Sequence, residues 1–387
     1  MSEKEEFDTL ASKLEERKSL NRLRSLVPSQ KSVDSSRIVR DGKTFINFSS
    51  NDYLGLSSHP KLIQRSVEYT QIFGTGSSSS RLITGSMNYH HQTEEKIAAL
   101  HGRERALLYN SGFQANATIL PAITKKGDWI IADKQCHNSM LRGCLSSPAV
   151  FYRFKHNDLN HLERFLKRFD KVNSGKCWIV TESLFSMDGD LTPLEELIDL
   201  ANKYGAKLYV DDAHAFGVYG RSGLGLTADL FDIDIVIGTF GKAAGSFGAF
   251  VLCNNIIANS LINFSTGFIY TTALPPSVVG SIDAAFDLIP MMDAERKHLH
   301  SLSGLLRTQL KEVGAEIGVG NSHIIPILLG SESDSLAMSQ KLEKKGIIAT
   351  AIRPPTVPEN QSRIRISLTA NHTEEQILKL LSHFKDA

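Results

Sequence analysis

The sequence predicts an α/β protein with a mostly parallel central sheet flanked by helices, followed by a smaller α+β domain. Between about residues 90 and 255, short apolar runs alternate with helical patterns, as expected of parallel strands joined by helices. After residue 280 the helices separate strands of a different pattern, and Pro354, Pro355 and Pro358 interrupt the chain. The length of 387 residues suits one large domain and one smaller domain.

The chain begins with an amphipathic pattern over residues 4–26. Its apolar residues recur at helical intervals with charged residues between them, and they include Phe7, Leu10, Leu14, Leu20 and Leu23. This pattern predicts a helix that packs its apolar side against another part of the protein. A loop follows, and TFINFSS (44–50) then predicts a short strand.

Apolar runs with helical patterns between them predict the strands of the large domain. The runs are ALLYNSG (106–112), WIIADKQCH (129–137), VFYRFKHND (150–158), WIVTESLFSMDG (178–189), KLYVDDAH (207–214) and IVIGTFGK (235–242). The intervening helices include LNHLERFLKRF (159–169) and LTPLEELIDLANKYG (191–205), and Gly205 is suited to ending the second one. GAFVLC (248–253) follows the last run too closely for a helical crossover, so we expect it to pair antiparallel.

We expect three segments along the chain. Residues 1–46 form an N-terminal helix and short strand, residues 47–280 the large α/β domain, and residues 281–387 the small α+β domain. The small domain's predicted strands are HIIPILLG (323–330), GIIATAI (346–352) and RIRISL (363–368).

The composition disfavours several classes of protein. A formal net charge of +1 provides no basic excess for binding nucleic acid through its phosphates. The four cysteines show no CxxC spacing, and no paired histidine spacing of a metal site accompanies them, so we expect neither a disulfide framework nor a metal site. No run reaches the roughly 18 apolar residues of a membrane span, and the opening MSEKEEFDTL lacks the layout of a signal peptide. We therefore expect a soluble cytoplasmic protein.

Several familiar motifs are absent from the sequence. A Walker A loop ending at Lys242 would need glycine where Val236 stands, and serine or threonine directly after the lysine. GRSGLG (220–225) has the wrong spacing for a dinucleotide fingerprint and follows no strand directly. GxSxG and HExxH do not occur, which disfavours the α/β-hydrolase and zincin mechanisms.

Polar side chains gather where the predicted strands end. They are Ser111, His137, Ser186, Asp211, His214, Thr239 and Lys242. In an open parallel sheet, ligands bind at the carboxyl ends of the strands. The pattern therefore predicts one shared site built from distant segments.

Lys242 and Asp211 together predict a pyridoxal phosphate site. A lysine amine can trap the cofactor's aldehyde, and an aspartate can hold the ring-nitrogen proton that makes the ring an electron sink. His214, three residues after Asp211, can face the same ligand. Taken singly, each residue has a plainer interpretation: Lys242 as a hairpin lysine facing water, and Asp211 and His214 as caps of the next element.

A place for the cofactor's phosphate is predicted at NSGFQAN (110–116). The chain turns there through Gly112 into a predicted helix, whose N-terminus favours an anion. Thr239 can add a hydroxyl, although a threonine in a strand is equally well explained by β-propensity.

Five ordered motifs resemble one family over nearly the whole chain. SSNDYLGL (49–56), NSGFQAN, FSMDGD (185–190), VDDAHAFGVYG (210–220) and TFGK (239–242) are similar to the α-oxoamine synthases, pyridoxal-phosphate enzymes of fold type I. The resemblance implies the condensation of a small amino acid with an acyl thioester and the release of carbon dioxide. It also implies a homodimer with shared active sites.

One branch of the family fits the last part of the chain best. AIRPPTVP (351–358) and SRIRISLTANHT (362–373) resemble the branch that joins L-alanine to a pimeloyl thioester in biotin synthesis. Either coenzyme A or an acyl carrier protein holds the pimeloyl group. The alternatives are a glycine-using member of the family, an aminotransferase of the same fold, and a non-catalytic protein of this fold.

The resemblance implies a role for each motif residue around the cofactor. Lys242 binds the aldehyde covalently, Asp211 pairs with the ring nitrogen, and His137 stacks over the ring. His214 and Ser186 hydrogen-bond the ring's phenolic oxygen or its surroundings.

The resemblance also implies contacts with the phosphate and the substrates. Gly112, Phe113 and Thr239 hold the phosphate, and Thr271 or Thr272 reaches it from a partner subunit. Arg365 binds the carboxylate of the amino acid, with Arg363 as a weaker candidate. The substrate side is lined by Arg24, Asn51, His91, His137 and Thr356.

The sequence departs from the family at Ser77–Ser80, where relatives usually have a glycine-rich run. Serine is small, but it tolerates a positive φ less well than glycine does. The departure concerns the backbone of this loop and its contacts with the acyl chain, and it leaves the cofactor chemistry intact.

Overall fold

The computed structural model describes residues 3–172 and 175–384, and the side chains of residues 3–8, Phe7 among them, lie outside this description. The chain divides into two compact units. The larger unit contains Asn51–Ser186 and Asp190–His298, and the smaller unit contains Met1–Ser50, Met187–Gly189 and Leu299–Ala387.

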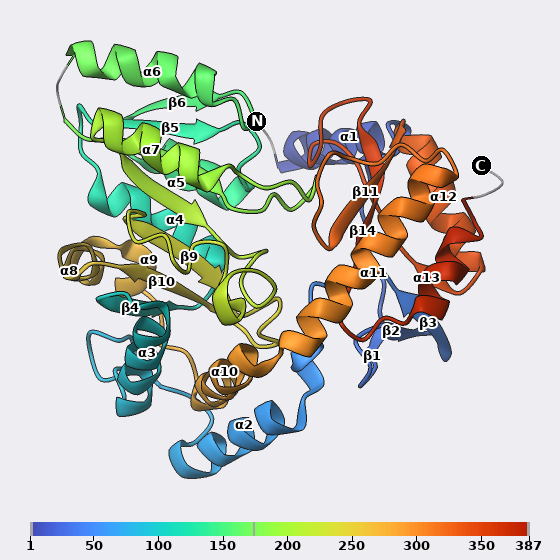
Figure 1. The fold of residues 1–387 in the computed structure, drawn as a ribbon, viewed down its shortest axis with the longest axis horizontal. Coiled ribbons are helices and arrows are strands. Elements are labelled where there is room, and N and C mark those ends of the chain that lie inside the picture. The colour runs from blue at the N-terminus through green and yellow to red at the C-terminus, as the bar shows by residue number, and fades with distance from the viewer. Residues whose placement is uncertain (1–2, 173–174, 385–387) are drawn as a thin grey trace. The chain divides into compact units, whose positions relative to one another are not determined.

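A seven-stranded sheet forms the centre of the larger unit (Figure 1). Its order is β4-β10-β9-β8-β7-β5-β6, and β10 alone runs antiparallel to its two neighbours in that sheet. The strands are β4 (Arg105–Tyr109), β5 (Trp129–Asp133), β6 (Val150–Phe154), β7 (Cys177–Glu182), β8 (Lys207–Asp211), β9 (Ile235–Thr239) and β10 (Ala249–Cys253). The mostly parallel sheet and the antiparallel GAFVLC strand are confirmed.

Helices cover both faces of this sheet. On one face, α4 (Gly112–Ile123), α5 (Asn138–Ser146), α8 (Asn255–Phe264) and α9 (Thr266–Ile269) contribute to a buried core with strand residues such as Ile130, Val180 and Ile237. The helices α3 (Asn88–His101), α6 (Leu159–Val172) and α7 (Leu194–Tyr204) contact β4, β5 and β8. Gly205 ends α7 with a left-handed φ of 62°, as predicted.

Aromatic rings fill the second face near β10. Phe250 on β10 has its ring centroid 5.0 Å from that of Phe216 and 5.4 Å from that of Phe240. Its neighbour Val251 belongs to the core on the opposite face, because successive strand residues point to opposite sides. Phe286 joins this group from α10 (Pro276–Leu288), which also packs on α2 (Pro60–Phe73).

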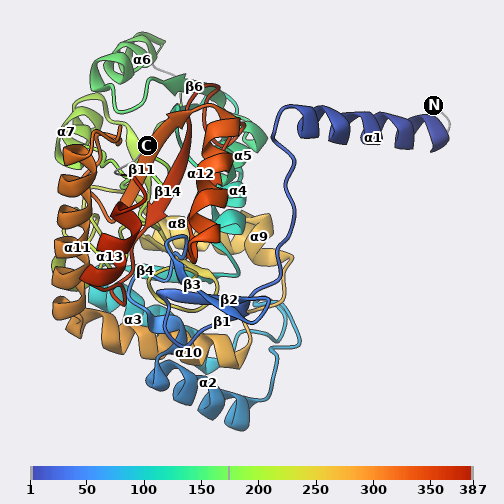
Figure 2. The same ribbon diagram turned by 90° about the vertical axis from the view of Figure 1, so that its right-hand side faces the viewer.

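The smaller unit contains two sheets, β1-β2-β3-β12 and β11-β14-β13. Figure 2 shows β11 and β14 with α12 and α13. Its strands are β1 (Gln30–Lys31), β2 (Arg37–Arg40), β3 (Lys43–Asn47), β11 (Ile324–Gly330), β12 (Ile347–Ile348), β13 (Thr350–Ile352) and β14 (Ser362–Ser367), and its helices include α12 (Glu332–Lys344) and α13 (Glu374–Leu381). The parallel pairing of β12 with β3 joins the N-terminal hairpin to the C-terminal part of the chain.

The helix α11 (Asp293–Glu312) has residues in both units, and short 3₁₀ turns lie at η1 (Leu56–Ser58), η2 (Arg221–Gly223) and η3 (Ile289–Met291).

The leading helix is shorter than predicted. The helix α1 ends at Ser19 instead of residue 26, and Asn21 follows with a left-handed φ of 55° that stops the helix. Arg22, three residues past the helix, donates to Glu332 at 2.8 Å. Leu10 and Leu14 are 51% and 55% exposed, so within this chain the apolar side of the helix stays largely uncovered.

One residue of the run Ser77–Ser80 adopts the positive φ that serine tolerates less well than glycine. Ser78 has a φ of 57°, in the region where a side chain is strained and glycine is not. Ser77 is buried, and its hydroxyl donates to the carbonyl of Leu274 at 2.7 Å. Ser77 is thus fixed by its side chain, while Ser78 accepts a conformation suited to glycine.

Within the described part of the chain, no helix is long and apolar enough to cross a membrane. The same residues contain no group of three or more His, Cys, Asp or Glu side chains suited to a metal ion. All four cysteines are free and buried.

Candidate active site

Asp211 ends β8 and lies among buried polar groups. One carboxylate oxygen, Oδ1, accepts the amide of Ala213 at 2.9 Å, and the other, Oδ2, accepts the side-chain amide of Asn116 at 2.7 Å. Asp212, the next residue, binds Thr227 instead, with its Oδ2 accepting the hydroxyl at 2.8 Å. Of the two adjacent aspartates, Asp211 is therefore the one connected to α4.

Asp211 and Lys242 both lie within electrostatic range of His137. Burial lowers the pKa of His137, the charge of Asp211 raises it, and the charge of Lys242 lowers it, with a net lowering. His137 is therefore neutral at pH 7. Since both charges act on this one imidazole, the structure brings together three predicted residues from different strand ends.

Glu182, at the end of β7, belongs to the same cluster. It pairs in register with Asp211 on the neighbouring strand, and its Oε1 accepts the backbone amide of His137 at 2.6 Å. Burial raises the pKa of Glu182 to about 8, with a further increase from Asp211 and an opposing effect from Lys242. The side chain thus fixes the chain segment that bears His137.

His214 and Asn51 are joined by a residue that sequence reasoning missed. The hydroxyl of Tyr53 lies 2.7 Å from Nδ1 of His214 and 3.2 Å from Oδ1 of Asn51. Tyr53 is fully buried. Ser186, four residues beyond the end of β7, is half-buried.

The predicted phosphate position is the N-terminus of α4, which begins at Gly112. Ser111 caps this helix by accepting the amide of Gln114, and the amides of Gly112 and Phe113 stand in the first turn, where a helix has no carbonyl to offer them. Thr239 donates its hydroxyl to the carbonyl of Gly248 at 3.0 Å. Binding an anion through Thr239 therefore requires this hydroxyl hydrogen to turn.

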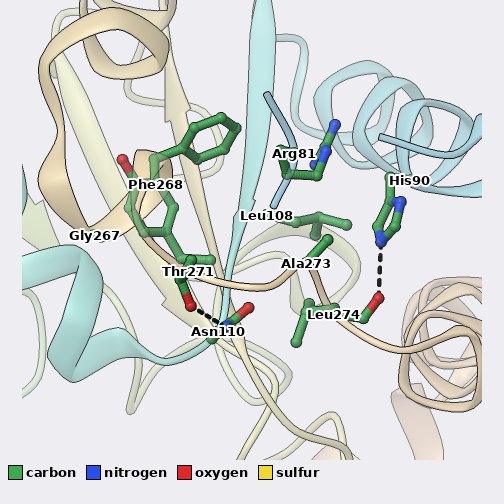
Figure 3. Close-up of a pocket in the computed structure, with 10 residues that line it drawn as sticks. Arg81, His90, Leu108, Asn110, Gly267, Phe268, Thr271, Ala273 and Leu274 are labelled. Carbon is green, nitrogen blue, oxygen red and sulfur yellow. Dashed lines mark hydrogen bonds between the residues drawn. The ribbon is translucent and has the colours of Figure 1, made fainter. Parts of the chain in front are cut away.

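Thr271 and Thr272 lie beside Asn110 of the same chain, just before the start of α4. The Asn110 side chain donates to the hydroxyl of Thr271 at 2.8 Å and to the carbonyl of Thr272 at 2.9 Å. Figure 3 shows the first of these bonds in a small cavity of about 10 Å³. The two threonines thus lie next to the segment that begins α4.

His91 is placed on α3 with contacts of its own. Its Nε2 lies 2.8 Å from the Ser86 hydroxyl, and its side chain is 54% exposed. The neighbouring His90 is buried and bonds the carbonyl of Leu274, as Figure 3 shows. The contact with Ser86 therefore holds the His91 side chain beside the start of α3.

The remaining substrate candidates belong to the smaller unit. Arg24 donates to the hydroxyl of Thr356 at 3.0 Å, so two predicted residues meet. Arg365 lies on β14 and is 8% exposed. Arg363, the weaker candidate, pairs with Asp188 and donates to the carbonyl of Gln361 at 3.0 Å, which gives its guanidinium a structural role.

Four residues of the larger unit's site were missed by sequence reasoning: Tyr53, Asn116, Glu182 and Tyr209. The sequence contains a partial signal for Tyr209 and Asn116. Tyr209 stands two residues before Asp211 on one strand, so the two side chains share a face. Asn116 ends the NSGFQAN motif, but only the fold shows that its position on α4 faces the end of β8.

The residues of the larger unit suit pyridoxal phosphate chemically. Asp211 is a buried carboxylate whose two oxygens are held by separate donors, as a partner for a ring N–H requires. Lys242 supplies an amine whose charge, like that of Asp211, acts on the pKa of His137. The start of α4 supplies backbone amides. The donor set therefore fits the cofactor at its nitrogen, aldehyde and phosphate.

Comparisons with known proteins identify the family of the chain. Residues 43–384 match the family of class I and II aminotransferases. A putative 8-amino-7-oxononanoate synthase of Desulfosudis oleivorans is 44% identical, over 98% of this chain and 98% of the relative. An 8-amino-7-oxononanoate synthase of Gluconacetobacter diazotrophicus is also 44% identical, over 90% of this chain and 89% of the relative.

A solved structure adds a match in three dimensions. A serine palmitoyltransferase variant from S. paucimobilis, with bound PLP–myriocin aldimine, superposes with a TM-score of 0.91. It is 29% identical, and the match covers 100% of this chain and 98% of the other. The chain therefore belongs to the α-oxoamine synthases, within the aminotransferase class I and II family.

Proposed function

We propose that this protein is an 8-amino-7-oxononanoate synthase. It condenses L-alanine with a pimeloyl thioester, releases carbon dioxide and the free carrier, and yields 8-amino-7-oxononanoate for biotin synthesis. The observation that best supports this is the cluster of Lys242, Asp211 and His137, in a chain 44% identical to synthases of that name over most of its length.

Pyridoxal phosphate, when bound, supplies an aldehyde for the amino group of alanine and a ring that accepts the electrons of a broken Cα bond. The negative charge of Asp211 would favour the protonated ring nitrogen, and Asn116 and the Ala213 amide hold this carboxylate in place. Lys242 would hold the cofactor's aldehyde through its amine, and the same amine is suited to taking a proton from the Cα of alanine. The neutral ring of His137 can lie against the cofactor without adding positive charge.

Other residues have roles in the same proposal. Arg365 binds the alanine carboxylate through its guanidinium fork and so selects which Cα bond breaks. Arg24 and Thr356, which are hydrogen-bonded to each other, contribute to binding the acyl substrate.

The proposal also covers the oligomeric state of the enzyme and the carrier of the pimeloyl group. We include in the proposal that the enzyme is a homodimer, with Thr271 or Thr272 completing the phosphate site of the partner subunit. The pimeloyl group arrives on coenzyme A or on an acyl carrier protein.

The test is product identification by mass spectrometry with purified, cofactor-loaded protein. Alanine, glycine and serine are each paired with pimeloyl, succinyl and acetyl thioesters. We expect 8-amino-7-oxononanoate from alanine and the pimeloyl thioester, with other pairs at least about tenfold slower, since pocket contacts discriminate at this level. Faster turnover of glycine with a short thioester would instead assign a glycine-using member of the family.

A further inference from the structure

Asn116 is a buried amide at the centre of a hydrogen-bond network in the larger unit. It is 2% exposed and projects from α4 toward the end of β8. Its Nδ2 donates to Oδ2 of Asp211 at 2.7 Å and to the hydroxyl of Ser139 at 3.1 Å. Its Oδ1 accepts the hydroxyl of Tyr209 at 2.7 Å.

The chemistry of the partners fixes the direction of each of these bonds. The carboxylate of Asp211 can only accept, so the amide must present its NH₂ group to it. The carbonyl oxygen of Asn116 then faces Tyr209, whose hydroxyl can donate. Tyr209 is fully buried and burial raises its pKa well above the usual value, so this hydroxyl keeps its proton.

The same directions continue to His137. Nδ1 of His137 accepts the backbone amide of Ser139 at 3.3 Å, and it lies 2.7 Å from the hydroxyl of that serine. Because Nδ1 accepts, the serine hydroxyl donates to it and accepts from Asn116. His137 is thereby set as the neutral tautomer with its proton on Nε2, in agreement with its lowered pKa.

The Asn116 amide is therefore linked to two members of the cofactor cluster of Lys242, Asp211 and His137. It binds the carboxylate that is to hold the ring nitrogen, and through Ser139 it orients the imidazole proposed to cover the ring. The second oxygen of Asp211 is fixed by the Ala213 amide at 2.9 Å, so the plane of the carboxylate depends on Asn116.

We propose that Asn116, oriented by Tyr209, is a positioning residue for pyridoxal phosphate: it aims the Asp211 carboxylate and, through Ser139, sets the tautomer of His137. The inference rests on the proposed function only in that the site binds this cofactor. It does not depend on which amino acid or thioester reacts.

The test uses the full-length protein and two variants that preserve side-chain shape. Asn116→Asp replaces the donating NH₂ with a carboxylate oxygen, so two carboxylates must share a proton and Asp211 holds the ring nitrogen less well. Tyr209→Phe removes the donor that orients the amide. Thr118→Val on the same helix is the matched control, because the Thr118 hydroxyl donates to the Gln114 carbonyl at 2.8 Å, away from Asp211.

Three quantities are measured for each protein. They are the dissociation constant of pyridoxal phosphate, the pH midpoint of the visible absorbance band of the lysine-bound cofactor, and the thermal stability of the cofactor-free protein. We expect Asn116→Asp to weaken binding about 10- to 100-fold, as for loss of a hydrogen bond to a charged group, and Tyr209→Phe about 2- to 10-fold. The absorbance midpoint should move upward in Asn116→Asp, because a less protonated ring opposes protonation of the lysine nitrogen less.

The outcomes either support or contradict the positioning role of Asn116. Thr118→Val should match the wild type in both cofactor measurements. If Asn116→Asp binds the cofactor and titrates like the wild type, or if its weaker binding only parallels a loss of thermal stability with no midpoint shift, the inference is wrong. A wild-type protein that binds the cofactor yet fails to make 8-amino-7-oxononanoate contradicts the proposed function alone, whereas one that takes up no cofactor contradicts both.

Discussion

Two histidines follow neighbouring strands of the same sheet, and their surroundings leave one positively charged and the other neutral. His156, two residues after β6, lies between two carboxylates: Nδ1 is 2.9 Å from Asp133 and Nε2 is 2.8 Å from Asp190. Burial would lower the pKa of His156, but the hydrogen bonds with Asp133 and Asp190 raise it to about 10. His137, four residues after β5, instead accepts from Ser139 and has a lowered pKa.

The comparison shows that the carboxyl ends of parallel strands can carry both a structural cluster and a ligand-binding cluster. In the Asp–His–Asp cluster of Asp133, His156 and Asp190, both ring nitrogens are committed to carboxylates of the same chain, and the ring packs edge-on against Phe185. In the cofactor cluster of Lys242, Asp211 and His137, the neutral amides of Asn116 and Ala213 orient the Asp211 carboxylate. The amine of Lys242 acts on the same imidazole, His137. We infer that the first cluster stabilises the fold, whereas the second binds a ligand.

The largest expected effect comes from removing the amine of the cofactor cluster. Lys242→Ala should lower the condensation rate by at least about 10²- to 10⁴-fold, since it deletes both the covalent anchor and the proposed base. The cofactor should still bind, but without the visible absorbance band of its bond to lysine. The stability of the cofactor-free protein should change little, which a thermal unfolding curve would show.

The contrary result is clear for this variant. If the band persists in Lys242→Ala, another amine holds the cofactor and Lys242 loses its assigned role. If the variant unfolds, the cofactor cluster also supports the fold and the contrast between the two clusters fails.

The contrast also shows what the sequence can predict. The mostly parallel sheet, the antiparallel β10 and the gathering of Lys242, Asp211 and His137 follow from periodicity and from the rule that ligands bind at the carboxyl ends of parallel strands. The partners of those residues do not follow, because Asn116 and Tyr209 look like ordinary helix and strand residues until α4 is packed on the sheet. The predicted end of the leading helix at residue 26 was also wrong. Asn21 adopts a left-handed backbone conformation at a position where the apolar spacing still favours a helix.

A smaller effect, on stability instead of chemistry, is expected from His156→Gln. The change leaves Asp133, which is fully buried, and Asp190 facing each other without the positive charge between them. Removing one partner of a buried ion pair typically costs 3–5 kcal/mol, and the 21% exposure of the His156 side chain reduces this to about 2–3 kcal/mol at pH 7. Denaturant unfolding of the cofactor-free protein measures it.

The control for this variant is His161→Gln. The ring of His161 accepts the Lys155 amide at 2.9 Å, so its loss should cost only about 1 kcal/mol. Well below its unfolding temperature, His156→Gln should keep its cofactor absorbance and its rate within about twofold of the wild type. Equal stability of the two variants, or a selective loss of rate in His156→Gln, would contradict the structural role of the Asp–His–Asp cluster.

The smallest expected effect is the pH dependence of that same stabilisation. The pKa of His156 is raised in the folded protein from 6.5 to about 10, so the folded state holds a proton that the unfolded state loses above pH 6.5. The contribution is therefore complete below pH 6.5 and is lost as the pH rises through 10. The stability difference between wild type and His156→Gln should shrink by about 1–2 kcal/mol over this range, a value reduced for partial exposure. Unfolding curves of both proteins at matched pH values separate this slope from the titration of all other groups, and a constant difference would mean that His156 is uncharged between its two carboxylates.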